Sequence, residues 1–452
     1  MPVREGKHIA FFGSSLVSGY WNEAATYYRG IIRALSAEGY RITFYEPDAF
    51  ERQNYRDIPD PPWAKVVVYS ARNEDAVREI LDEAQNADLI IKASGVGVFD
   101  QLLEAAVVET AEKARKQRPY TLSIFWDVDA PATIDRIHHN PDDPFQSLIP
   151  RYDLILTNGG GKPIVDAYQA LGARQCVPVY NALDPLTHYP VSPDSRFASD
   201  LGFCGDRLPD REMRVREFLF KAASTLPTHR FLLAGSGWPV ISTWRENSAP
   251  DHIPETRAGH RPEAGGGQGH KTETDQRRKA KTGINPKSET ASGFETGIRA
   301  EDDAGTKTDL RAGTRRRHDT MLPENVCSIG HLYTQEHNAF HCSARVVLNI
   351  SREGTARYGF SPSIRIFEAA GAGACIITDA WEGLEMFLEP GTEILTAKNG
   401  LEVAEHLLSL TPATIQAIGQ AARRRVLAEH TYEHRARQLV SLLETFNAEG
   451  KF

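Results

Sequence analysis

The chain has 452 residues, a length that is enough for two or three folded domains. Its formal net charge is −8 and its hydrophobic fraction is 41%. The acidic balance disfavours a general nucleic-acid binder, because such proteins carry a basic surface. The five cysteines are scattered without a CxxC pair, so neither a disulfide framework nor a cysteine-based metal site is indicated. We expect a cytoplasmic protein, since no apolar run approaches the roughly 20 residues of a membrane span and the N-terminal run is too short for a signal peptide.

Short apolar runs alternate with helical patterns through the first half of the chain. Helices are predicted over residues 24–38, 73–86 and 99–116. Strands are predicted over residues 8–12, 41–45, 65–69, 88–92, 120–126, 153–157 and 175–180. Near-continuous apolar strands that alternate with helices are typical of a parallel, doubly wound sheet. Residues 1–190 are therefore predicted to form an N-terminal Rossmann-like domain.

A second series of the same kind begins near residue 199. A helix is predicted over residues 211–224, and strands over 201–205, 230–237, 326–330, 346–350 and 375–378. We predict a second Rossmann-like domain over residues 199–430. Within it, residues 242–320 contain almost no large apolar side chain, so they are predicted to be a disordered insertion. Residues 431–452 are predicted to form a C-terminal helix that packs back toward the N-terminal domain.

The stretch from Arg357 to Ala374 combines a glycine-bearing turn, a Ser-Pro helix start near Ser361 and a small-residue helix end. A helix N-terminus carries partial positive charge and free N–H groups, and therefore favours a bound phosphate. The alternative is an ordinary connection between a helix and a strand.

Further polar and glycine residues follow predicted strands, where ligands bind in open α/β sheets. Each could be an ordinary turn, but together they favour a nucleotide or sugar-phosphate cleft. No GxGxxG, P-loop, GxSxG or HExxH motif accompanies them. The residues concerned are Gly13, Ser14 and Ser15, then Gly205, Asp206 and Arg207, then Ser236 and Gly237, and Arg352.

Two carboxylate positions are candidates for chemistry. Asp127 and Asp129 follow the strand over residues 120–126, where a carboxylate can act as a general base or as a helix N-cap before Pro131. Glu368 lies about two turns into the helix after Ser361, among small residues. It could accept hydrogen bonds from a ribose, as acidic residues do in nucleotide-binding folds, or it could face solvent.

Residues 349–352, 357–368 and 377–383 resemble the donor domain of GT-B glycosyltransferases, and more narrowly the spore-maturation CgeB-type family. Residues 202–207, 330–333 and 428–443 fit this resemblance as well. It implies two tandem Rossmann-like domains facing a central cleft. A nucleotide-sugar donor would bind mainly to the second domain. The unknown acceptor, whether glycan, protein or small molecule, would face the first domain, where Gly13, Ser14 and Ser15 form the acceptor-side loop.

By this resemblance Glu368 binds the donor ribose, and Arg207 and Arg352 face the diphosphate with help from N–H groups around Ser361 and Ser363. The remaining expected donor-binding residues are Gly205, Asp206, Ser236, Gly237, Tyr358, Gly359 and Arg365. No metal or other cofactor is expected, because cationic side chains and a helix terminus can carry the leaving-group charge. No nucleic-acid partner is expected either, because the chain is acidic overall.

One position departs from the family pattern. Retaining GT-B enzymes often carry two glutamates eight positions apart, and Phe360 stands where the first would precede Glu368. The stereochemistry is therefore open. An inverting enzyme would need a base from the first domain, for which Asp127 is preferred over Asp129. Two alternatives remain: a catalytically silent GT-B module that binds a nucleotide-sugar or protein partner, and a sugar-nucleotide epimerase.

Overall fold

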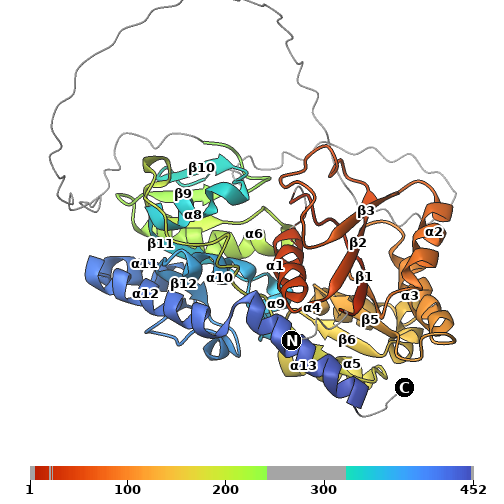
Figure 1. Cartoon of the computed structure of the whole chain (residues 1–452). Helices are drawn as coiled ribbons and strands as arrows, with labels where there is room; N and C mark the ends of the chain where they lie inside the picture. Colours follow the sequence, from red (N-terminus) through yellow and green to blue (C-terminus); the bar gives the residue numbers. More distant parts are fainter. Residues whose placement is uncertain (1–5, 20–21, 23, 242–321, 449–452) are drawn as a thin grey trace, which may run out of the picture. The chain divides into compact units, whose positions relative to one another are not determined.

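The computed structural model describes residues 6–19, 22, 24–241 and 322–448. The predicted insertion over residues 242–320 lies outside the described residues. Two parallel sheets flanked by helices form the described chain (Figure 1), and both belong to one compact unit. The prediction of an α/β protein with two doubly wound sheets is confirmed.

The first sheet has seven strands in the order β3-β2-β1-β4-β5-β6-β7, and all its pairs are parallel. Its central strand β4 is buried along its whole length, because helices cover both faces of the sheet. The strands are β1 His8–Phe12, β2 Arg41–Asp48, β3 Lys65–Ser70, β4 Leu89–Ala93, β5 Leu122–Asp127, β6 Leu154–Thr157 and β7 Cys176–Pro178. The helices are α1 Ala24–Ala37, α2 Glu74–Ala84, α3 Asp100–Ala114, α4 Ala130–His139 and α5 Gly161–Ala170.

The second sheet has six strands in the order β10-β9-β8-β11-β12-β13, again all parallel. The predicted helix over residues 211–224 begins earlier, at Pro209, and contains a π-helical segment over Arg216–Phe220. The strands are β8 Ser199–Cys204, β9 Phe231–Ala234, β10 Val326–Gly330, β11 Ala344–Asn349, β12 Ile376–Asp379 and β13 Leu395–Ala397. The helices are α6 Pro209–Val215, α7 Lys221–Thr225, α8 Thr334–Ser343, α9 Glu353–Tyr358, α10 Ile364–Gly371, α11 Gly400–Ser409 and α12 Pro412–Glu429.

The two sheets share the same winding. In each sheet the strand order reverses at the strand that comes first in sequence. β1 lies between β2 and β4, and β8 lies between β9 and β11. Loops that leave neighbouring strands to opposite faces open a crevice at this point, and ligands bind there. We therefore expect a ligand site at the carboxyl ends of β1, β4, β8 and β11.

The last helix, α13 (Tyr432–Ala448), returns to the first domain and packs on α1 (Figure 1). The rings of Tyr27 and Tyr432 meet edge to face with centroids 5.9 Å apart. Gly30 is required at this contact, because a Cβ on it would lie 2.1 Å from Cδ2 of Tyr432. Leu439 and Leu443 extend the same apolar cluster.

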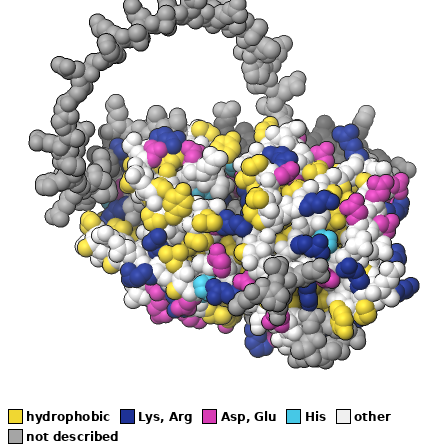
Figure 2. All heavy atoms as spheres, viewed as in Figure 1, with side chains coloured by type: hydrophobic (Ala, Val, Ile, Leu, Met, Phe, Trp, Pro, Cys, Tyr) yellow, Lys and Arg dark blue, Asp and Glu magenta, His cyan; other side chains and the backbone are white. Residues whose placement is uncertain are grey.

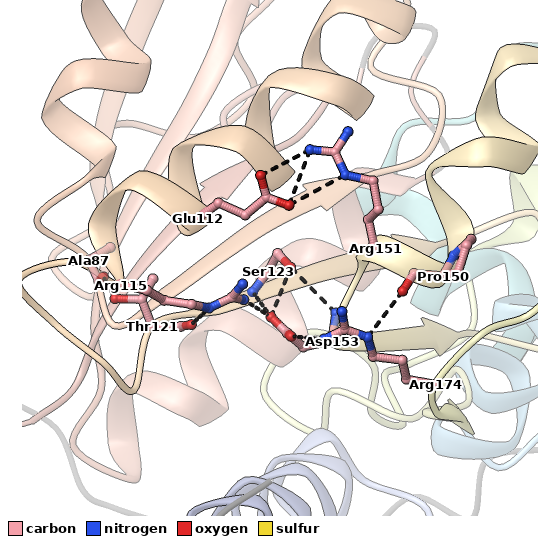
Figure 3. A network of polar contacts seen from close by, with 9 residues as sticks. All are labelled: Ala87, Glu112, Arg115, Thr121, Ser123, Pro150, Arg151, Asp153 and Arg174. Atoms are coloured by element: carbon pink, nitrogen blue, oxygen red, sulfur yellow. Dashed lines mark hydrogen bonds and ion pairs between the residues drawn. The ribbon is translucent and has the colours of Figure 1, made fainter. Parts of the chain in front are cut away.

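A polar network closes the amino-terminal edge of the first sheet, opposite the ligand-facing edge (Figure 3). Asp153, just before β6, accepts hydrogen bonds from the backbone N–H (2.8 Å) and Oγ (2.9 Å) of Ser123 in β5. Arg174 Nη1 lies 2.9 Å from Asp153 Oδ1. Arg115, at the end of α3, pairs with Asp153 Oδ2. The network fixes the start of β6 against β5.

No helix among the described residues is both long enough and apolar enough to span a bilayer. Lys and Arg side chains are interspersed with Asp and Glu over the face seen in Figure 2.

Candidate active site

A cavity of about 550 Å³ lies where loops after the first-sheet strands meet loops of the second domain. The first domain contributes Ser94 and Gly95 after β4, Asp129 after β5, and Asn158 and Gly159 after β6. The second domain contributes Ser351 and Arg352 after β11, Thr355 of α9, Arg211 of α6, and Ser361 to Ile364 at the start of α10. The cavity is thus built largely from the carboxyl ends of parallel strands, as the winding of both sheets predicts.

The second-domain wall of this cavity favours anions. Arg211 and Arg352 both line it, and α10 begins beside it with Ser363 as its N-cap, whose Oγ accepts a hydrogen bond from the backbone N–H of Arg365 at 3.3 Å. Two guanidinium groups and a helix N-terminus together provide the positive potential and N–H donors that a diphosphate needs.

The start of α10 differs from the prediction. We expected the helix to begin near Ser361, but it begins at Ile364. Ser361 precedes Pro362, and the residue before a proline is driven out of the helical region. Phe360 has a positive φ of 45°, which also keeps the turn non-helical. The short helix α9 (Glu353–Tyr358) was not predicted, because it has no buried residue and therefore no apolar periodicity.

The turn before α10 contacts the first domain directly. The backbone N–H of Gly160 donates to Ser361 Oγ at 2.7 Å and to the Phe360 carbonyl at 3.0 Å. A Cβ on neighbouring Gly159 would lie 2.7 Å from Ser361 Oγ, so glycine permits this approach. The turn before α10 and the loop after β6 are thus joined directly by these hydrogen bonds.

Asp129 forms an ion pair with Arg352 at the cavity. Its Oδ2 lies 2.9 Å from Arg352 Nη1, and both side chains are partly exposed, 42% and 36%. Asp129 occupies the N-cap position of α4, yet its side chain makes no capping hydrogen bond. The capping role that the sequence left open therefore does not account for this carboxylate.

Asp127, the base preferred from the sequence, is buried, at 0% exposed, and does not line the cavity. Its Oδ1 accepts from Thr133 Oγ1 and the Asp129 N–H, each at 3.1 Å, and its Oδ2 accepts from Tyr168 Oη at 2.5 Å. Asp127 is the last residue of β5, and its side chain packs against Thr133 of α4 and Tyr168 of α5. Asp129, two residues further along the chain, reaches the cavity.

Glu368 is buried in α10. It is 2% exposed and does not line the cavity, and its Oε2 lies 2.7 Å from Arg365 Nη1. Burial alone would raise the pKa of Glu368, but the Arg365 guanidinium and His188 beside it together hold that pKa well below the ordinary value.

His188, His337 and Glu368 have ligand atoms that all lie within 4.8 Å of one another, which raises the question of a metal. Arg365 Nη1 also lies 3.0 Å from Nδ1 of His337, so a cationic group already occupies the space beside two of the three ligands. Burial, followed by the charge of Arg365, lowers the pKa of His337. An added cation at this cluster would therefore lie beside the Arg365 guanidinium, which already pairs with Glu368.

The glycine-ended loops of the second domain come together as predicted but stand apart from the 550 Å³ cavity. Asp206 Oδ1 accepts from the Ser236 N–H at 2.6 Å. Gly205 accepts through its carbonyl from Trp238 Nε1 at 2.9 Å. Arg207 is held by Glu212 at 2.8 and 2.9 Å, so it does not face the diphosphate-sized space that Arg211 and Arg352 line.

Three further expected residues have structural contacts outside that cavity. Tyr358 Oη donates to Asp135 at 2.8 Å, and Gly359 adopts a positive φ of 67° at the end of α9. Gly237, with φ of 81°, sits against Arg207. These residues shape the turns beside the second-domain wall of the cavity.

The expected acceptor-side loop is also buried away from the cavity. Ser14 Oγ donates to Asn22 at 2.8 Å, and Ser15 Oγ donates to the buried Glu46 at 3.1 Å. Gly13 lies against the ring of Phe44. The loop after β1 is thus fixed to the core, and the loop after β4 lines the cavity.

Sequence reasoning missed Arg211, Asn158 and Thr355, all of which line the cavity. Arg211 could have been found, because it lies in the first turn of the helix that Pro209 begins, just after the glycine-ended strand β8. Asn158 and Thr355 carry no comparable local signal.

Comparisons with known proteins agree with this architecture. Residues 304–441 match the family model described as glycosyl transferase-like. The structure of HepE from Anabaena in complex with UDP-glucose is similar to 97% of this chain and 100% of its own, with a TM-score of 0.57 at 12% identity. The protein has a GT-B fold.

Two other structures support the same assignment. Sucrose-phosphate synthase from Thermosynechococcus elongatus matches with a TM-score of 0.57 at 14% identity, over 98% of this chain and 100% of its own. An α-glucosyltransferase in complex with UDP-glucose and DNA containing an abasic site matches with a TM-score of 0.57 at 11% identity, over 97% and 100%. A search by sequence among curated proteins gives no match.

Proposed function

We propose that this GT-B protein is a glycosyltransferase of the CgeB-type branch that transfers a sugar from a nucleoside-diphosphate-sugar to an acceptor hydroxyl. The observation that carries the proposal is one cavity with cations on one wall, Arg211 and Arg352, and the carboxylate of Asp129 on the other. UDP-glucose is the first donor to test, because similar folds have been determined with it.

The diphosphate would lie against Arg211, Arg352 and the start of α10. Guanidinium groups and a helix N-terminus stabilise negative charge on a departing diphosphate, so the reaction would need no metal. Ser361 and Ser363 would supply hydroxyl and backbone donors beside the same space. Glu368 would reach the ribose only after Arg365 has moved from its carboxylate.

In the transfer step the acceptor oxygen attacks the anomeric carbon as the bond to the β-phosphate oxygen breaks. The bonding pair leaves with the nucleoside diphosphate, and the acceptor proton passes to Asp129. A direct attack of this kind inverts the anomeric centre. Phe360 occupies the place of the first family glutamate, and its ring packs against Gly383, which supports inversion over retention.

Donor binding is tested by following the melting temperature of the full-length protein during titration with UDP. A ligand that binds only the folded state stabilises it by RT ln(1 + [L]/Kd). We expect UDP to raise Tm, and Arg211→Ala and Arg352→Ala each to weaken its Kd by about 10- to 100-fold, the loss of one charge-assisted hydrogen bond.

Arg437→Ala is the matched control, because Arg437 lies on the exposed face of α13 and bonds only within its own helix among the described residues. No Tm shift with UDP or any other nucleoside diphosphate would contradict the proposal. UDP binding without any sugar transfer or donor hydrolysis would favour the silent binding module instead.

A further inference from the structure

The first-domain end of the cavity has a chemistry of its own. Ser94 and Gly95 follow β4, and Asp100 and Glu104 lie one turn apart on α3; all four line the cavity. A Cβ on Gly95 would meet nothing within 4 Å, so the backbone there borders open space. This end lies on the opposite domain from the guanidinium groups that line the donor wall.

Both carboxylate oxygens of Asp100 bond the protein. Its Oδ1 accepts from Lys92 Nζ at 2.5 Å and from the Val96 N–H at 3.1 Å, and its Oδ2 accepts from the Gly97 N–H at 2.8 Å. These bonds hold the loop after β4 in place. Asp100 thus has a structural role at this end of the cavity.

Glu104 differs from Asp100. It is 4% exposed, and its nearest charged partner is Lys92 Nζ at 3.8 Å, which is beyond hydrogen-bond length. Within the described parts of the chain its carboxylate accepts no hydrogen bond. A buried carboxylate without a donor is costly, and here it borders a cavity from which a ligand can supply one.

The surrounding charges restrict which ligand can do so. Asp129 and Asp100 line the same end, and Arg136, the lining cation, is paired through Nε with Asp143 at 3.0 Å. Burial raises the pKa of Glu104, and the charges of Lys92 and Arg136 oppose that rise. An anionic group at this end would face the carboxylates of Asp100, Glu104 and Asp129.

We propose that Glu104 is the acceptor-binding residue of the proposed transferase, and that the acceptor is a sugar hydroxyl compound that is neutral or carries an amine, and not a phosphorylated sugar or a nucleic acid. The inference rests on the proposed function. Glu104 accepts a hydrogen bond from an acceptor hydroxyl or ammonium and orients it, while Asp129 faces the reacting centre.

The test measures UDP release from UDP-glucose by the full-length protein with water alone and with added acceptors. The acceptors are methyl α-glucoside, glucosamine, glucose 6-phosphate and a DNA duplex. We expect the first two to raise the release rate and the last two to leave it at the rate with water. Glu104→Gln should raise the half-saturating acceptor concentration by about 10- to 100-fold, while the UDP-induced Tm shift is retained.

Glu112→Gln is the matched control, because Glu112 lies two turns further along α3 and pairs with Arg151 on the surface. If Glu104→Gln fails to fold, Glu104→Asp keeps the charge beside Lys92 and withdraws the carboxylate by one methylene, and it should show the same defect more weakly. A retained Tm shift with UDP identifies folded variants.

Stimulation by glucose 6-phosphate or DNA equal to that by methyl α-glucoside overturns the inference. An unchanged acceptor response in Glu104→Gln, or no stimulation by either sugar in a protein that binds UDP, overturns it too and leaves the donor site intact. Absence of a UDP-induced Tm shift removes the proposed function itself, and with it this inference.

Discussion

Replacing Asp129 and Asp127 one at a time by asparagine separates a catalytic carboxylate from a structural one. The two residues are neighbours in sequence, yet Asp129 faces Arg352 in the cavity and Asp127 is 0% exposed. We expect Asp129→Asn to lower kcat for transfer by about 10²- to 10⁴-fold, the usual contribution of a general base. Its Tm should be almost unchanged, because a partly exposed ion pair contributes about 0–1 kcal/mol.

Asp127→Asn should show the opposite pattern. Asparagine can still accept from Thr133 and the Asp129 N–H, but its amide replaces the oxygen that accepts from Tyr168 Oη at 2.5 Å. Losing one buried, charge-assisted bond costs about 1–3 kcal/mol, or about 2–4 °C in Tm per kcal/mol for a domain of this size. The kcat of the folded fraction should stay within a few-fold of the parent.

The assay is UDP release in the presence of methyl α-glucoside, with Tm and the UDP-induced Tm shift recorded for each variant. The shift shows that the donor site is intact when the rate is low. The reasoning is refuted if Asp127→Asn abolishes transfer at unchanged Tm, or if Asp129→Asn retains the parental rate while binding UDP.

Three further predictions concern the fold. Gly30→Ala should destabilise the protein by about 1–3 kcal/mol in denaturant unfolding, since its Cβ would lie 2.1 Å from Tyr432; an equal cost in the Tyr432→Ala background would contradict the clash. Asp153→Asn should lower stability by about 2 kcal/mol, because the carboxylate bonds Ser123 and pairs with arginines, while UDP affinity measured by titration stays unchanged. Burial, helped by Arg435, lowers the pKa of His430 to about 3, so only the unfolded state, with a pKa near 6.5, takes up its proton as pH falls. The stability that neutral His430 contributes above pH 6.5 is lost between that pH and about 3, and the loss is roughly 2 kcal/mol at pH 5. In His430→Gln the free energy of unfolding by denaturant should therefore differ less between pH 7.5 and pH 5 than in the parent. An identical difference would refute the assignment.

The sequence determined the fold class, because that information is local. Apolar runs such as 88–92, bounded by polar turns, predict buried parallel strands, and β4 is buried along its whole length. Strand ends could also be read from the chain, so the edge of each sheet that faces a ligand was predictable, and with it Arg352, Ser361 and Ser363.

Tertiary structure decided which side chains at those strand ends reach the cavity. Asp127 and Asp129 carry the same chemistry in the sequence, and only the point at which β5 ends turns one inward and the other to Arg352. The same holds for Arg207 and Arg211, since the Glu212 pair that withdraws Arg207 depends on side-chain geometry in α6.

Contacts between distant segments lay beyond the sequence for a related reason. The Gly160 N–H bonds Ser361, 201 positions away, and Asp129 pairs with Arg352, 223 positions away. Neither segment alone has a pattern that requires the other. The sequence by itself therefore determined two doubly wound sheets and the strand ends that border the cavity, whereas the cluster of Asp100, Glu104 and Asp129 exists only because the folded chain brings β4, α3 and α4 around one cavity.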